Sequence, residues 1–320
     1  MSADPLPEWP IFGFADDVRP ALAQALEAGH PAALVTLYAV EGGGPRPPGT
    51  QMLFAGGQAS GFLSGGCVEA DVAGHAARTL ADGAPRHLVY GEGGPWPDIR
   101  LLCGARIELL VERIAPDDAA AIRLIALMGA RRPAVWRTDG VTRSCDAGAG
   151  PLCAVTSDPF RLVRRHDPVP RLVVVGGDPT ALAIAALGAQ SGMEAILVRP
   201  KGPTTPPPLA GVAYRRDPAA EVLASLTLDP WTAVAIATHD VDTDHEALGP
   251  ALTSAAGYVG LLGARRRLPE RLDRLRADGV AEAAISRLRA PIGLPIGGKA
   301  PWEVAVTVIA EIMAERRNLG

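Results

Sequence analysis

Two different hydrophobic patterns divide the chain. In the first half, short apolar segments of strand length alternate with helical segments, and turns rich in Gly and Pro join neighbouring strands. The predicted strands are 33–40, 50–55, 61–64, 87–90 and 107–113, and the predicted helices are 17–28, 67–81 and 117–128. Strands that are adjacent in sequence favour antiparallel pairing, so this half is predicted to be an α+β domain.

The second half alternates strand with helix. Residues 172–175 form a continuous apolar run, which is typical of a strand buried on both faces of a parallel sheet. A helix at 181–190 and strands at 195–198, 234–237 and 258–262 extend a βαβ series. The chain is therefore predicted to be an α/β protein whose second domain is a Rossmann-like, doubly wound parallel sheet.

Both patterns break down between residues 144 and 170, where Gly, Pro and Arg are frequent. This interruption predicts an N-terminal domain at 1–155, a linker at 156–170 and a C-terminal domain at 171–320.

Composition excludes some classes of protein. The chain has 320 residues and a net charge of -4, so it has no overall attraction for nucleic acid or for an anionic membrane. Its first residues lack the pattern of a secretory signal, and no apolar run reaches membrane-spanning length. Four cysteines do not make a disulfide scaffold at this size. We expect a protein of the reducing cytoplasm.

The tetrad Ser64-Gly65-Gly66-Cys67 stands between a predicted strand and a predicted helix that opens at the cysteine. Unpaired N–H groups and the helix dipole favour a thiolate at that position, and the two glycines allow a ligand to approach the backbone closely. The pattern indicates chemistry, or ligation of a soft metal, at Cys67. A buried structural thiol is the alternative interpretation.

The first turn of the second domain departs from the dinucleotide-binding fingerprint. It reads Gly176-Gly177-Asp178-Pro179-Thr180-Ala181, so Asp178 replaces the second glycine. A carboxylate there repels phosphate where the helix N-terminus would bind it. The second strand ends at Arg199 without the acidic residue that holds a ribose. Both departures argue against ordinary NAD(P) binding.

Further polar groups follow the later strands. His239 and Asp240 come after the strand 234–237, at the sheet edge where open α/β folds bind ligands. Gly263, Arg265 and Arg266 belong to a glycine-rich turn suited to an oxyanion, although a solvated cationic flank has the same sequence. A divalent-metal site of His239, Asp242 and His245 is another interpretation, without any known ligand spacing.

Five motifs along nearly the whole chain resemble the XdhC/CoxI family: SGGCVE (64–69), LLCGARIELLVE (101–112), THD (238–240), YVGLLGARRR (258–267) and APIGLPIGGKAPWEVAVTVIAEI (290–312). The resemblance implies a cytoplasmic, non-enzymatic chaperone. It would bind molybdenum cofactor, as molybdopterin or its cytosine dinucleotide form, and protect it during sulfuration by a NifS-like cysteine desulfurase. The chaperone would then insert the cofactor into an apo molybdenum hydroxylase such as xanthine dehydrogenase, aldehyde oxidoreductase or carbon monoxide dehydrogenase. A homodimer is common for such a carrier.

The resemblance also implies a set of site residues. Cys67 and Cys103 match the family's cysteines and are candidates for ligating or positioning molybdenum, and Arg46 lies in a similar PRP element. Ala105, Ala264 and Asp178 depart from the family's pattern. The predicted cofactor-binding residues are Arg46, Ser64, Gly65, Gly66, Cys67, Glu69, Cys103, His239, Asp240, Gly263, Arg265 and Arg266.

Two other functions compete with the chaperone. One is an NAD(P)-dependent oxidoreductase on the Rossmann-like domain, which Asp178 opposes. The other is a cysteine-dependent sulfur transferase, in which Cys67 would accept a persulfide.

Overall fold

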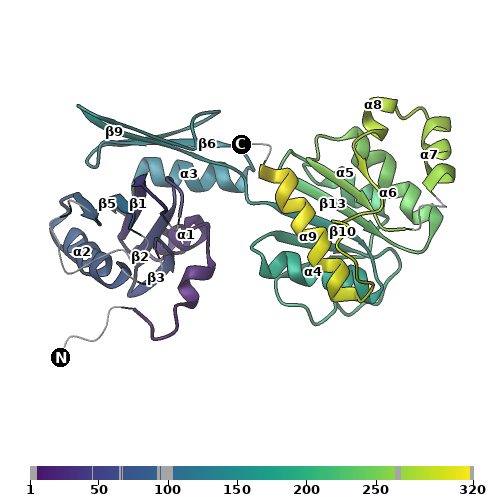
Figure 1. Ribbon diagram of the computed structural model, residues 1–320, viewed down its shortest axis with the longest axis horizontal. Helices are drawn as coiled ribbons and strands as arrows, with labels where there is room; N and C mark the ends of the chain where they lie inside the picture. Colours follow the sequence, from purple (N-terminus) through teal and green to yellow (C-terminus); the bar gives the residue numbers. More distant parts are fainter. Residues whose placement is uncertain are drawn as a thin grey trace. The chain divides into compact units, whose positions relative to one another are not determined.

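The computed structural model describes residues 6–44, 46–64, 66, 68–91, 94, 104–263 and 268–317. The chain forms two compact units, Met1–Pro168 and Val169–Gly320 (Figure 1). Among the described residues, no helix combines the length and the apolar character needed to cross a membrane.

The main sheet of the first unit is antiparallel, in the order β3-β2-β1-β5-β4. Its strands are β1 (Ala32–Glu41), β2 (Gln51–Ala55), β3 (Gln58–Gly61), β4 (Arg86–Tyr90) and β5 (Arg106–Ile114). The central strand β1 is buried on both faces, because its alternate residues pack on different layers. Ala33, Val35 and Leu37 face helix α2 (Glu69–Asp82). Ala32 and Leu34 face α1 (Arg19–Glu27) and α3 (Ala119–Gly129).

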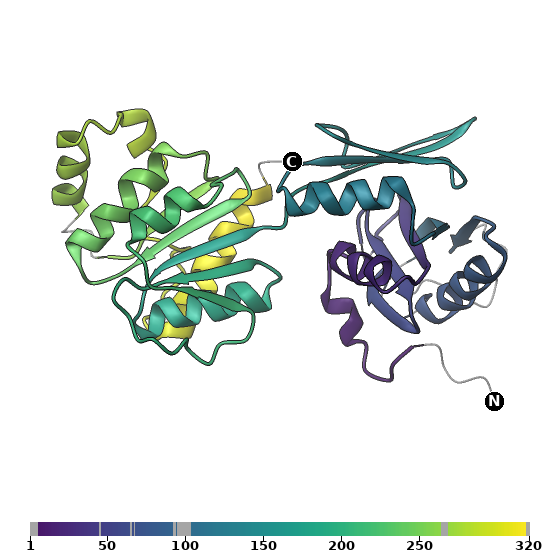
Figure 2. The ribbon, with the colours of Figure 1, turned by 180° about the vertical axis from the view of Figure 1, so that it is seen from behind.

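A second sheet of the first unit, in the order β7-β6-β9-β8, extends from the predicted N-terminal domain into the predicted linker at 156–170. Its strands are β6 (Ala134–Thr138), β7 (Arg143–Ala147), β8 (Cys153–Ser157) and β9 (Phe160–His166). Figures 1 and 2 both show α3 running along one face of it. The region 156–166 is thus strand and turn. Its polar, arginine-rich sequence hides this, because pairing with β6 and β8 uses backbone groups that any residue supplies.

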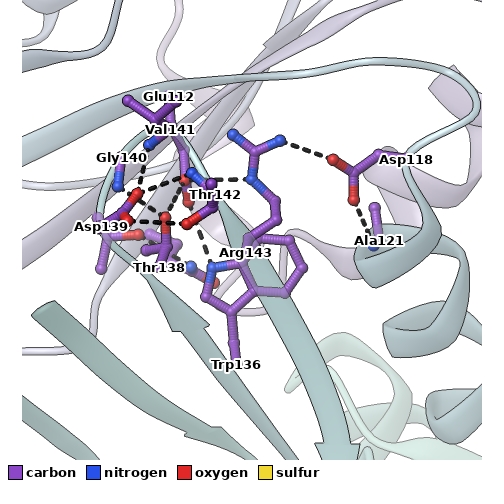
Figure 3. Close-up of polar contacts among 12 residues, drawn as sticks. Glu112, Asp118, Ala121, Trp136, Thr138, Asp139, Gly140, Val141, Thr142 and Arg143 are labelled. Carbon is purple, nitrogen blue, oxygen red and sulfur yellow. Dashed lines mark hydrogen bonds and ion pairs between the residues drawn. The ribbon is translucent and has the colours of Figure 1, made fainter.

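A buried polar network joins this second sheet to the rest of the unit (Figure 3). Glu112, on β5, is fully buried and accepts hydrogen bonds from Trp136 Nε1 at 3.3 Å and Thr138 Oγ1 at 2.7 Å. Arg143 pairs with Glu112 at 3.4 Å and with Asp118 at 2.6 Å, and Asp118 caps α3 through Ala121 N. Burial raises the pKa of Glu112. The network therefore ties β5, β6, β7 and α3 together.

The second unit is a parallel sheet in the order β12-β11-β10-β13-β14-β15, as predicted. Its strands are β10 (Arg171–Gly176), β11 (Glu194–Val198), β12 (Val212–Arg215), β13 (Thr232–Ala237), β14 (Tyr258–Leu261) and β15 (Leu288–Arg289). Helices α4 (Pro179–Gln190) and α9 (Pro301–Arg317) cover one face (Figure 1). The other face packs against α5 (Ala219–Ser225), α6 (Val241–Thr253), α7 (Leu268–Ala277) and α8 (Glu282–Ile285). Because both faces are covered, β10 is buried along its whole length.

The order of the strands defines a topological switch point. From β10 the chain passes through α4 to β11 on one side, whereas β13 pairs with β10 on the other side. The connections leave the sheet in opposite directions at the carboxyl ends of β10 and β13, and this is where open α/β sheets bind ligands.

Candidate functional site

The loop between β3 and α2 is built around one buried carboxylate. Glu69 is 2% exposed. Its Oε1 accepts from the N–H groups of Leu63 at 3.1 Å and Ser64 at 2.7 Å, and its Oε2 accepts from Ser64 Oγ at 2.8 Å and Val68 N at 3.3 Å. These bonds hold both ends of the loop against the first turn of α2. Glu69 thus holds Leu63, Ser64 and Val68 from inside, a role that the motif alone does not indicate.

The Glu69 carboxylate also explains where helix α2 begins. The helix predicted to open at Cys67 begins instead at Glu69, the first residue of α2. The N–H groups of Leu63 and Val68, which flank the tetrad, bond to the Glu69 side chain, and this favours a loop before residue 69. Gly66, at φ 91°, has open space around the position of a Cβ. Gly65 and Cys67 lie outside the described residues.

Arg46 belongs to the loop that follows β1. Its Nη2 forms an ion pair with Asp16 Oδ1, and the Asp16 side chain is 79% exposed. An ion pair with so exposed a partner contributes little to stability, so it opens at low cost. The loop itself is anchored at Gly49, whose carbonyl oxygen accepts a hydrogen bond from Arg164 Nε on β9. This bond joins the loop of Arg46 to the second sheet of the unit at Gly49.

The two cysteines that the structure describes, Cys145 and Cys153, are not the predicted pair Cys67 and Cys103. Burial raises the pKa of Cys145 to about 11 and also raises the pKa of Cys153. A thiol with a raised pKa stays protonated at neutral pH and is a poor nucleophile. Cys145 is therefore a structural residue of the first unit. Cys103, the other predicted site cysteine, lies outside the described residues.

The switch point of the second unit carries Asp178 and His239. Asp178 Oδ1 accepts the N–H of Ala181 at 2.8 Å and so caps α4, while its Oδ2 lies 3.1 Å from His239 Nε2. The His239 side chain is 82% exposed. The capping carboxylate occupies the helix terminus that would otherwise receive a phosphate. This geometry gives a physical reason for the predicted loss of ordinary NAD(P) binding.

Asp240 caps the next helix. Its Oδ1 accepts the N–H of Thr243 at 2.8 Å at the start of α6. That bond is the main reason why the pKa of Asp240 lies below its ordinary value. The carboxylate is charged and exposed at neutral pH, beside His239 in sequence.

A buried ion pair links the loop 238–240 to α7. Asp244 is fully buried and accepts from Thr238 Oγ1 at 2.6 Å. Its other oxygen accepts from Arg271 Nη2 at 2.6 Å and Nε at 3.1 Å. Helix α7 follows the basic segment 264–267 in sequence, so one carboxylate fixes the elements that flank two predicted binding loops. Arg265 and Arg266 lie outside the described residues, and Gly263 is exposed with open space at its Cβ position.

The structure does not assemble the alternative divalent-metal site. His245 lies 2.5 Å from Asp278, and Asp242 pairs with Arg274, so neither side chain turns toward His239 as a ligand set requires. Within the ranges that the structure describes, no group of three or more His, Cys, Asp and Glu side chains is arranged to hold a metal ion.

Comparison with known proteins gives consistent matches along the chain. A model of the XdhC and CoxI family matches residues 25–91, and a model of the XdhC Rossmann domain matches residues 172–312. The chain is 31% identical over 312 residues to the molybdenum cofactor insertion chaperone PaoD of Escherichia coli (strain K12), covering 94% of this chain and 89% of PaoD.

Two further proteins are similar over nearly their full length. The chain is 27% identical over 327 residues to a probable xanthine dehydrogenase subunit of Bacillus subtilis (strain 168), covering 92% of this chain and 96% of that protein. A crystal structure described as a xanthine dehydrogenase from Bacillus halodurans aligns with a TM-score of 0.73 at 22% identity, over 95% of this chain and 96% of that one. That likeness shows that the two chains share a fold.

Proposed function

The chain belongs to the XdhC and CoxI family, and we propose that it binds molybdenum cofactor and delivers it to an apo molybdenum hydroxylase. The observation that carries the proposal is the 31% identity to PaoD over 89% of that chaperone's length. The cofactor is cargo, so the chain needs no turnover of its own. The finer parts of the proposal are cytoplasmic action and a homodimeric carrier.

The candidate residues fit such a cargo chemically. Molybdenum cofactor is a pterin that carries a dithiolene at the metal end and a phosphate at the other end. Cys67 and Cys103 supply soft ligands for the metal end, and Arg265 and Arg266 supply guanidinium donors for oxyanions. His239 is exposed at the switch point and can hydrogen-bond a pterin. Glu69 holds the loop that contains Cys67, so its role is positioning.

Sulfuration is the finer step of the proposal. We propose that the bound cofactor is sulfurated while a NifS-like cysteine desulfurase is docked, and that Cys67 ligates or positions the metal. In a relay, Cys67 would instead carry a persulfide. Mass spectrometry after incubation with a saturating persulfide donor separates the two roles: an unlabelled Cys67 excludes the relay.

Anaerobic titration with molybdenum cofactor tests the central proposal. We expect the wild-type chain to bind with a Kd near 1 µM or below, about -8 kcal/mol. Cys67→Ala and Arg265→Ala should each weaken binding about ten-fold, whereas Arg161→Ala, at an exposed position of β9, should not. A second readout is transfer of the cofactor to an apo molybdenum hydroxylase. A folded wild-type chain without saturable binding would remove the proposal.

A further inference from the structure

A strongly basic turn lies at the carboxyl ends of β11 and β12. Arg199, Lys201, Arg215 and Arg216 are all exposed there, and the neighbouring Asp217 forms a loose, exposed ion pair with Arg215 at 3.9 Å. Backbone bonds hold the two chain segments together: Arg199 N donates to Arg215 O at 2.9 Å, and Lys201 N donates to Arg216 O at 3.2 Å. Four cations thus gather at one corner of the ligand-binding edge, in a chain whose net charge is -4.

Arg199 lies across the glycine loop of the Rossmann-like unit. A Cβ added to Gly177 would lie 2.4 Å from both Cδ and Nε of Arg199, so any other residue at 177 would displace this side chain from its position. Within the described ranges, no hydrogen bond or ion pair engages the guanidinium group of Arg199. An unpaired cation therefore occupies the backbone surface that a pyrophosphate approaches in a dinucleotide-binding domain.

The turn that presents these cations has an unusual backbone. Lys201 has φ 55°, a left-handed conformation that few residues other than glycine adopt. Its neighbour Gly202 is buried and donates to Arg199 O at 3.0 Å, and a Cβ there would meet the Tyr214 hydroxyl at 2.2 Å. Arg216 Nε in turn donates to Gly202 O at 2.8 Å. Contacts with β12 thus hold Lys201 in a backbone conformation that a residue with a side chain rarely adopts.

We propose that Arg199, with Lys201, Arg215 and Arg216, forms an anion subsite for the phosphate-bearing end of the bound cofactor. The inference rests on the proposed function. It explains how a glycine loop whose helix terminus is capped by Asp178 still receives a phosphate: a guanidinium group above Gly177 replaces the backbone donors. The phosphate is either the terminal phosphate of molybdopterin or the pyrophosphate of the cytosine dinucleotide form.

Calorimetric titrations of the full chain test this subsite. The variants are Arg199→Gln, Gly177→Ala and the control Arg276→Gln, whose arginine is exposed at the end of α7 and pairs with Asp273 on α7 and Glu282 on α8. Each protein is titrated anaerobically with inorganic pyrophosphate, with the molybdopterin form and with the cytosine dinucleotide form.

We expect Arg199→Gln to weaken pyrophosphate binding about ten-fold, and Gly177→Ala to do the same by displacing Arg199 with no loss of charge. Arg276→Gln should match the wild type.

The cofactor arms identify the source of the phosphate. If Arg199→Gln loses the same affinity for both cofactor forms, the subsite binds the terminal phosphate. If it loses affinity for the dinucleotide form alone, the subsite binds the phosphates of the nucleotide. If Arg199→Gln and the control bind pyrophosphate and both forms alike, the inference is wrong. If the wild type binds neither form, the proposed function is wrong, and the pyrophosphate arm still decides whether this turn binds anions.

Discussion

The two candidate binding regions are built in opposite ways. In the first unit, a single buried acid, Glu69, accepts four hydrogen bonds from the loop that precedes α2. In the second unit, the acids at the sheet edge cap helices, and the side chains of Arg199 and His239 are exposed. The first region fixes a loop from inside, whereas the second presents charge to solvent. Substitutions should therefore affect mainly stability in the first kind of region and mainly ligand affinity in the second.

Substitution of Asp244 should give the largest loss of stability, because Asp244 is a buried acid in a unit whose other sheet-edge acids cap helices. Asp244→Ala leaves Arg271, which is 6% exposed, without its main counter-charge. We expect a loss of about 3–5 kcal/mol in the free energy of unfolding, measured by urea denaturation. Asp242→Ala removes an exposed pair with Arg274 on the same two helices and should cost about 0.5 kcal/mol or less. Equal losses in both variants would show that the buried pair does not hold α7.

Glu69 should rank second. Glu69→Ala leaves the N–H groups of Leu63, Ser64 and Val68 without their acceptor, and we expect a loss of about 2–3 kcal/mol. Glu69→Gln keeps one acceptor oxygen and should lose about 1 kcal/mol. Urea midpoints measure the stability, and hydrogen exchange of residues 62–68 measures the order of the loop. Glu27→Ala, at the exposed end of α1, is the control. Unchanged exchange in Glu69→Ala would contradict the anchoring role.

Acid should weaken the first unit through His166. Burial, and then the nearby Arg164 and Arg19, hold the pKa of His166 well below its ordinary value. The unfolded chain therefore takes up the proton first, so this stability is present above pH 6.5 and is lost as the pH falls below it, by up to about 1.4 kcal/mol per pH unit. In His166→Gln the loss between pH 6.5 and 5.5 should shrink by about 1 kcal/mol, and in the exposed control His30→Gln it should not. Identical pH profiles for all three proteins would refute this.

Asp178 should give the smallest effect on stability. Asp178→Ser keeps a capping oxygen and should change the free energy of unfolding by about 0.5 kcal/mol or less, whereas Asp178→Ala should cost about 1 kcal/mol. Neither should create NAD(P) binding, because the residue that follows β11 is Arg199 rather than an acid. Fluorescence titration with NADH and NADPH checks this. Micromolar binding by the wild type would favour the oxidoreductase that Asp178 argues against.

Hydrophobic patterns were sufficient to predict the fold class of the second unit and four of its described strands, but not β12 or β15. The run 172–175 and the later apolar strands predicted a doubly wound parallel sheet, and the structure confirms it. A strand buried on both faces must be apolar throughout, so its signal is strong. The strands β8 and β9 gave no such signal, since β9 carries Arg161, Arg164 and Arg165 and little of it is buried. Its place in a sheet depends on pairing with distant β6.

The candidate site also has features that the sequence predicts and features that it does not. The switch-point position of His239 and Asp240 could be predicted, because a residue after a buried strand lies at the carboxyl edge. The partners of Glu69, Asp244 and Arg199 could not, since each depends on tertiary contacts. An acid directly after a glycine turn and at a helix start was the available signal for Glu69. No local pattern pairs Asp244 with Arg271, or places Arg199 over Gly177.

The bond between Arg164 and the carbonyl of Gly49 has a consequence for synthesis of the chain. Its two ends are 115 residues apart. At about 5–20 residues per second, the ribosome makes Arg164 roughly 6–23 s after Gly49. The loop that contains Arg46 therefore cannot be anchored until the β8–β9 hairpin has been synthesised. Because the first unit ends at Pro168, this anchor can form while the Rossmann-like unit is still being translated.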